Sequence, residues 1–82
     1  MKEVNFKYVN ANGEKSDRRV LVIEDNAGYV EGIDYTHLTK DKATALRAMA
    51  SSKTTEFDPK GYMDAYRRFN RKNMTNIKEE IL

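Results

Sequence analysis

The segment Arg18–Asp25, with the sequence RRVLVIED, decides the fold. Its centre, Val20–Ile23, is apolar at four successive positions and rich in β-branched residues, which favour strands. A strand that is apolar on both faces needs cover on both sides, as in the middle of a sheet. The segment therefore predicts a central strand, and the flanking sequence must supply its neighbours.

Two shorter segments are predicted to pair with this central strand. Val4–Val9, VNFKYV, alternates apolar and polar residues as a half-buried strand does, and Asn10–Gly13, NANG, is a turn sequence. Tyr29–Asp34, YVEGID, follows a second turn and contains Gly32, which permits a bend or a bulge. Short turns join antiparallel neighbours, so residues 3–34 are predicted to form a three-stranded antiparallel meander.

The hydrophobic period changes from two to 3.6 near Thr39, a residue that favours the N-cap position of helices. Asp41 follows in the first turn, where a negative charge suits the helix dipole. Four apolar residues then share one helical face: Ala43, Leu46, Met49 and Ala50. The pattern predicts a helix over Lys40–Ser51.

The last third of the chain gives mixed signals. Asp58-Pro59 combines an N-cap residue with an N1 proline and predicts a helix from Pro59 to about Ala65. Tyr66–Arg71 stays open, because its apolar spacing favours a helix whereas the family resemblance described below favours a strand. Thr75 is a candidate cap for a short last helix over residues 76–82.

These elements predict one α+β domain over residues 1–82, with the meander in residues 1–34. Residues 39–82 are predicted to be mainly helical, with two or three helices and a fourth late strand as the alternative over Tyr66–Arg71. The predicted core consists of the larger apolar residues of these elements: Phe6, Tyr8, Leu21, Ile23, Ile33, Leu46, Met49, Tyr66 and Phe69.

Three segments resemble a known family. RRVLVI at Arg18–Ile23, YVEGID at Tyr29–Asp34 and YRRFNRKNM at Tyr66–Met74 together resemble a shortened, divergent WYL domain, including its phage-type relatives with an SH3-like β-barrel. The resemblance implies a small antiparallel SH3-like sheet. It also implies a role in sensing ligands or nucleic acid and in regulating transcription or defence systems.

The match to the WYL pattern is partial. Tyr29-Val30 stands at the family's Tyr-Leu pair, and Arg67 and Phe69 stand at its late Arg and Phe. Gly28 replaces the family's Trp, and Asn73-Met74 replaces its final Arg-Ile. The missing Trp and second Arg weaken the implication of ligand sensing.

Composition limits the function classes. The chain has no Cys, which is typical of a protein in a reducing compartment, and we expect a cytoplasmic location. The longest apolar run, Val20–Ile23, is far too short for a membrane span, so no membrane insertion is expected. The net charge of +2 is unevenly spread: residues 1–41 hold six Lys/Arg and eight Asp/Glu, whereas residues 42–82 hold nine and five.

The sequence does not predict an enzyme, a cofactor or a metal site. There is no thiol nucleophile, and the single histidine, His37, excludes a two-histidine metal site within one chain. Asp34 and His37 are spaced for an acid–base pair, but a surface loop between strand and helix explains them more simply.

The strongest candidate for a binding surface is the basic stretch near the C-terminus. The predicted partner-binding residues are Arg18, Arg19, Tyr62, Arg67, Arg68, Arg71 and Lys72. Basic residues interleaved with aromatics are also found in nucleic-acid grooves. We expect a small regulatory or accessory protein that binds a protein partner with an acidic face, and the alternative is a WYL-type nucleic-acid-binding regulator.

Overall fold

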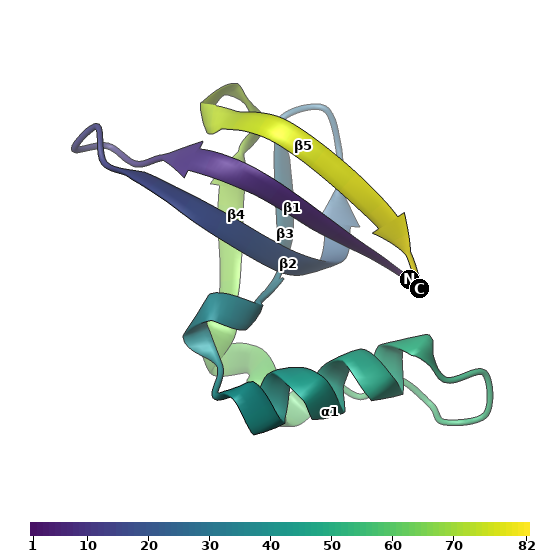
Figure 1. Ribbon diagram of the computed structural model, residues 1–82. Coiled ribbons are helices and arrows are strands. Elements are labelled where there is room, and N and C mark those ends of the chain that lie inside the picture. Colours follow the sequence, from purple (N-terminus) through teal and green to yellow (C-terminus); the bar gives the residue numbers. More distant parts are fainter.

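The computed structural model describes the whole chain, Met1–Leu82. Its strands are β1 (Lys2–Val9), β2 (Lys15–Asp25), β3 (Tyr29–Asp34), β4 (Tyr66–Asn70) and β5 (Met74–Ile81). The single α-helix is α1 (Lys40–Ser51), and three 3-10 segments are η1 (Tyr35–His37), η2 (Lys60–Ala65) and η3 (Arg71–Asn73). Figure 1 shows the strands in one curved sheet, with α1, η1 and η2 gathered below it.

The five strands form one antiparallel sheet in the order β4-β3-β2-β1-β5. Short turns join β1 to β2 and β2 to β3. The connection from β3 to its neighbour β4 is longer and contains η1, α1 and η2. The last strand returns to pair with the first, so both chain ends lie side by side (Figure 1). The backbone amide of Leu82 donates to the carbonyl of Met1 at 2.9 Å.

The sheet curves strongly, and all five strands contribute to one core on its inner face. This core contains Val4, Phe6, Val20, Val22, Val30, Phe69 and Met74, with Tyr8 at its margin. Three of its aromatic rings meet edge to face, and the Phe69 centroid lies 5.1 Å from Phe6 and 5.0 Å from Tyr8. Such aromatic pairs stabilise a core beyond the area that they bury.

A second core lies between the sheet and the helical layer. It contains Leu21, Ile33, Tyr35, Leu46, Ala50 and Ala65. The side chain of Thr39 caps α1 by accepting from the amide of Lys42, and the apolar face of the helix turns toward the sheet. Alternation along β2 sends Val20 and Val22 into the first core and Leu21 into the second.

Gly32 and Ile23 mark a bulge between β2 and β3, where the register shifts between Val22 and Glu24. A Cβ at Gly32 would lie 1.9 Å from the backbone oxygen of Leu21, so the close approach of the two strands requires glycine there. Ile23 is left at the shift and is 40% exposed, so its predicted place in the core is wrong.

The predicted fold class is wrong in its strand and helix content. Instead of a three-stranded SH3-like sheet followed by two or three helices, the chain has five strands and one α-helix. The predicted helix from Pro59 is the 3-10 segment η2. Tyr66–Arg71, for which the sequence leaves helix and strand as alternatives, is mainly the strand β4. The predicted last helix is the strand β5, because its residues pair with β1.

Other local predictions are confirmed. The three strands of the meander and the helix Lys40–Ser51 with its Thr39 cap are present. Five predicted core residues are buried: Phe6, Leu21, Ile33, Leu46 and Phe69. Tyr8, Met49 and Tyr66 are partly buried and pack against the margins of the two cores.

We expect Phe69→Ala to unfold most of the protein, because Phe69 is only 4% exposed and contacts the other two rings of the inner core. Removing a buried Phe costs about 3–5 kcal/mol, and a small domain has only about 5 kcal/mol in total. Ile23→Ala is the control and should cost less than about 1 kcal/mol. Urea unfolding followed by circular dichroism measures both, and equal losses would contradict the assigned core.

Candidate functional site

The seven predicted partner-binding residues occupy β2 (Arg18 and Arg19), η2 (Tyr62), β4 (Arg67 and Arg68) and η3 (Arg71 and Lys72). Four of the six basic side chains form ion pairs with carboxylates of the same chain: Arg18, Arg19, Arg68 and Arg71. Much of the predicted basic charge is therefore neutralised within the molecule.

Arg18 stabilises the point where β3 leaves the sheet. Its Nη1 donates to Asp34 Oδ2 at 3.0 Å and to Thr36 Oγ1 at 3.3 Å, and its guanidinium lies 5.9 Å from the Phe69 ring centroid. Asp34 is fully buried, so the ion pair compensates a carboxylate that has lost its water. The side chain of Arg18 thus joins β2 to the start of η1.

Asp34 and His37 lie close together, with His37 Nε2 3.6 Å from Asp34 Oδ2. Both oxygens of Asp34 are already engaged, since Oδ1 accepts from the amide and the hydroxyl of Thr36 and Oδ2 accepts from Arg18. Asp34 is the N-cap of η1. The contacts of this pair are those of a structural cap at the junction of strand and helix.

A second buried carboxylate, Glu3, forms a cluster with Arg19, Tyr35 and Arg47, which we call the Glu3 cluster. Glu3 is fully buried on β1. Its Oε2 accepts from Arg19 Nη2 at 3.1 Å, and its Oε1 accepts from the Tyr35 hydroxyl at 2.9 Å and from Arg47 Nε. The donors come from β2, η1 and α1, so one carboxylate connects the sheet to the helical layer.

The surroundings of Glu3 favour its charged form. Burial raises the pKa of the Glu3 carboxyl, but hydrogen bonds from Arg47 and Tyr35 and the charges of both arginines outweigh burial, so the pKa lies below its ordinary value of 4.5. Burial and the hydrogen bond to Glu3 raise the pKa of the Tyr35 phenol. The cluster therefore keeps a negative charge at its centre at neutral pH, with two positive charges around it.

Arg68 lies against the outer face of β3. Its Nε donates to Glu31 Oε2 at 2.8 Å, and its guanidinium stacks 4.0 Å from the Tyr29 ring centroid. The hydroxyl of Tyr66 donates to the other Glu31 oxygen at 3.3 Å. These contacts hold β4 against β3, and Glu31 neutralises the charge of Arg68 within the sheet.

Arg71 belongs to a chain of charges across the end of the sheet. It forms an ion pair with Asp25 and donates to the carbonyl of Asn26 at 2.7 Å, and Lys2 Nζ lies 2.6 Å from Asp25 and 3.2 Å from Glu79. Hydrogen bonds from Lys2 and Arg71 lower the pKa of the Asp25 carboxyl below its ordinary value. These contacts tie η3 to β1, β2 and β5.

Two predicted basic residues, Arg67 and Lys72, are exposed and have no carboxylate partner. Arg67 Nη1 donates to the backbone carbonyls of Asp64 and Tyr66, both at 2.8 Å. Tyr62 is half-buried and packs against the core under the helix. We call Arg67, Lys72 and Met63, which is 48% exposed and lies in η2 just before β4, the basic edge.

The structure does not bring the seven residues onto one surface. Alternation places Arg18 beside Val20 on the inner face of β2, whereas Arg19 reaches the Glu3 cluster on the helix side. Sequence reasoning missed Glu3 and Arg47 altogether. A polar residue of an alternating strand usually faces solvent, and no local signal in the sequence shows that a distant helix covers Glu3.

The surface has two main hollows. One of about 540 Å³ lies where β5 bulges from β1, at Phe6, Asn76 and Ile77, and a second of about 390 Å³ lies between the Ala27-Gly28 turn and η3. No group of three or more His, Asp or Glu side chains is arranged to hold a metal ion. None of the helices combines the length and the apolar character needed to cross a membrane.

Comparisons with known proteins give no relative: no family model, curated protein or solved structure matches this chain.

We expect Glu3→Gln to reduce both the stability of the protein and its dependence on pH. Because the folded-state pKa of Glu3 is lowered, its contribution is present above the ordinary pKa of 4.5 and is lost as the pH falls through the folded-state value. The loss at pH 7 should be about 1–3 kcal/mol, since Arg19 and Arg47 keep 40% and 39% side-chain exposure and can be solvated.

Urea unfolding between pH 7 and pH 2 measures this effect. The wild type should lose free energy of unfolding more steeply below about pH 5 than Glu3→Gln does. Asp25 keeps its own acid dependence in both proteins, so it does not affect the comparison. Equal slopes in the two proteins would rule out a charged Glu3 as a source of stability.

Proposed function

We propose that this chain is a small non-enzymatic regulatory or accessory protein that binds a protein partner with an acidic face. The observation that carries the proposal is the basic edge: Arg67 and Lys72 are the two predicted site cations left exposed and without a carboxylate partner. Complementary charge speeds association and fixes the orientation of two proteins.

Two features of the basic edge favour a protein over a nucleic acid. A nucleic-acid binder neutralises several phosphates, each with its own cation. Here four of the six candidate cations already neutralise carboxylates of this chain. A stacking platform also needs an exposed aromatic face, whereas Phe69 is only 4% exposed and Tyr66 is partly buried.

The apolar contact of the proposed surface comes from Met63 in η2. Its side chain is exposed, four positions before Arg67, whereas Tyr62 packs inward. Methionine adapts its shape to a partner and is enriched in protein interfaces. Met63, rather than the predicted Tyr62, is therefore the side chain that contributes most apolar contact area to the proposed surface.

The setting of the proposed function rests on sequence features alone. The absence of cysteine supports a cytoplasmic location. The likeness to WYL and phage-type barrel proteins supports a role in regulation, such as host takeover, anti-defence activity or the timing of lysis, and stays a prediction. The positive charge of the basic edge fits a protein surface with clustered acidic side chains.

Charge reversal of the basic edge tests the proposal. Arg67→Glu with Lys72→Glu should abolish co-purification of the partner from lysate of the native host, because two attractive charges become repulsive. Stability should change by less than about 1 kcal/mol per substitution, because both side chains are exposed and water can replace the hydrogen bonds of Arg67 to the carbonyls of Asp64 and Tyr66. Quantitative mass spectrometry with and without nuclease measures capture.

The matched control is Lys42→Glu with Lys53→Glu, which makes the same charge change at two exposed lysines without ion pairs on α1 and its following loop. This variant should keep the partner. Titration with duplex DNA, single-stranded DNA and RNA at near-physiological salt completes the test. Micromolar or tighter binding to any of them, abolished by the basic-edge variant, would replace the proposal with a nucleic-acid function.

A further inference from the structure

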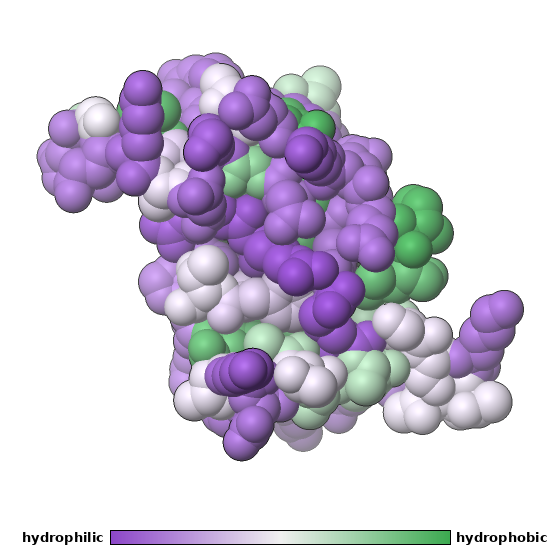
Figure 2. Space-filling model, in the orientation of Figure 1, coloured by the Kyte–Doolittle hydropathy of each residue, from purple (hydrophilic) through white to green (hydrophobic).

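The outer edge of β5 is uncovered along its length. β5 ends the strand order of the sheet, and all its residues from Thr75 to Ile81 are exposed. They include Ile77 and Ile81, which are 41% and 77% exposed. Figure 2 shows a mainly hydrophilic face with its most hydrophobic area beside the end of β5, near the chain ends. An uncovered edge strand readily pairs with another strand.

The other edge strand, β4, is less open to pairing. Arg67 folds along it and donates to the carbonyl of Tyr66 within β4 and to that of Asp64 just before it. β4 is also shorter, with five residues against eight in β5. A short strand offers fewer backbone groups for pairing, and the carbonyls that accept from Arg67 are already occupied. The open edge of the sheet is therefore β5.

The backbone of β5 determines which of its groups face outward. The amide of Leu82 donates to the carbonyl of Met1, and Glu80 and Lys78 are paired with Glu3 and Asn5. In an antiparallel ladder, alternate residues direct both their N–H and C=O groups at the neighbouring strand. Lys78 and Glu80 thus face β1, which leaves the polar backbone groups of Glu79 and Ile81 directed away from it, whereas Ile77 adjoins the bulge at Asn76, whose φ is 53°.

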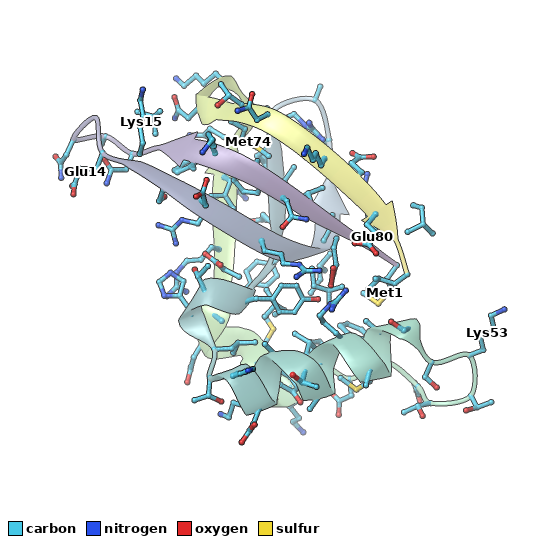
Figure 3. The ribbon with its side chains drawn as sticks, viewed as in Figure 1. Met1, Glu14, Lys15, Lys53, Met74 and Glu80 are labelled. Atoms are coloured by element: carbon cyan, nitrogen blue, oxygen red, sulfur yellow. The ribbon has the colours of Figure 1, made fainter.

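We propose that two copies of this chain form a symmetric dimer by pairing β5 with β5 in antiparallel orientation, centred on Glu79. In this register Ile77 lies opposite Ile81 of the other copy on one face, and Lys78 lies opposite Glu80 of the other copy on the other face. A two-fold axis repeats each pair, so the interface contains two apolar pairs and two opposite-charge pairs. Figure 3 labels Met74 and Glu80, which lie toward opposite ends of β5.

The neighbouring registers are unfavourable. The outward-facing backbone groups of Glu79 and Ile81 restrict the allowed shifts to those that keep alternate residues opposite one another. One shift places Lys78 opposite Lys78 and the other places Glu80 opposite Glu80. Both place an isoleucine opposite Glu79. Like charges directly opposite destabilise a strand pair, so the register centred on Glu79 is selected.

The proposed register leaves one like-charge pair, Glu79 opposite Glu79 on the axis. Each of these carboxylates has Lys2 Nζ of its own chain at 3.2 Å. The two lysines offset the repulsion at the centre. The dimer does not depend on the proposed function, because the basic edge lies in η2, β4 and η3, outside the segment Ile77–Ile81 that pairs.

Charge exchange across the interface tests the dimer. Sedimentation over a range of concentrations should give the wild type twice the 9.5 kDa mass of the chain. Lys78→Glu and Glu80→Lys should each raise the dissociation constant about tenfold or more, because each replaces two opposite-charge pairs with two like-charge pairs. An equimolar mixture of the two variants restores both opposite-charge pairs and should form heterodimers at wild-type concentrations.

Lys53→Glu is the matched control, since it makes the same charge change on an exposed loop that follows α1 and is not part of β5 (Figure 3). It should leave the dissociation constant unchanged. Native mass spectrometry of the mixture, with one variant isotope-labelled, identifies the heterodimer. A wild type that is monomeric at every concentration, variants that still dimerise as the wild type does, or a mixture without heterodimers would each overturn the proposal.

Discussion

The buried charge of Glu3 is the constraint on which the arrangement of the sheet and the helical layer depends. A carboxylate without water needs several hydrogen-bond donors, and Glu3 receives them from Arg19, Tyr35 and Arg47. The donors belong to β2, η1 and α1, which are far apart in the sequence. If α1 moved away from the sheet, Glu3 would lose a charged donor. The cluster therefore determines the position of α1 on the sheet and also stabilises the contact between them.

Three further carboxylates are held by ion pairs between different segments of the chain. Arg18 compensates buried Asp34, Arg68 holds Glu31, and Arg71 with Lys2 holds Asp25. Each pair joins segments that are separated in the sequence. These ion pairs connect the elements of a small protein that has no disulfides. The consequence for function is that, of the six basic residues predicted to bind a partner, only Arg67 in β4 and Lys72 in η3 have no carboxylate partner.

The sequence was informative where the signals are local. The Thr39 cap and the alternation of Val4–Val9 identified a helix and a strand correctly. The Thr75 cap predicts a helix over residues 76–82, but most of these residues belong to β5, and no local signal shows their pairing with β1 at the other end of the chain. The site was only partly predictable for the same reason, since Arg71 and its partner Asp25 are 46 residues apart.

A double-mutant cycle between Glu3 and Arg47 tests most directly the claim that the buried carboxylate joins helix and sheet. The free energy of unfolding of the wild type, Glu3→Gln, Arg47→Met and the double variant is measured in urea at pH 7. A charged hydrogen bond of this kind should give a coupling energy of about 1.5–3 kcal/mol. The exposed pair Lys7 and Asp17, 3.0 Å apart, is the control cycle and should give less than about 1 kcal/mol. Additive effects of Glu3→Gln and Arg47→Met would contradict the account.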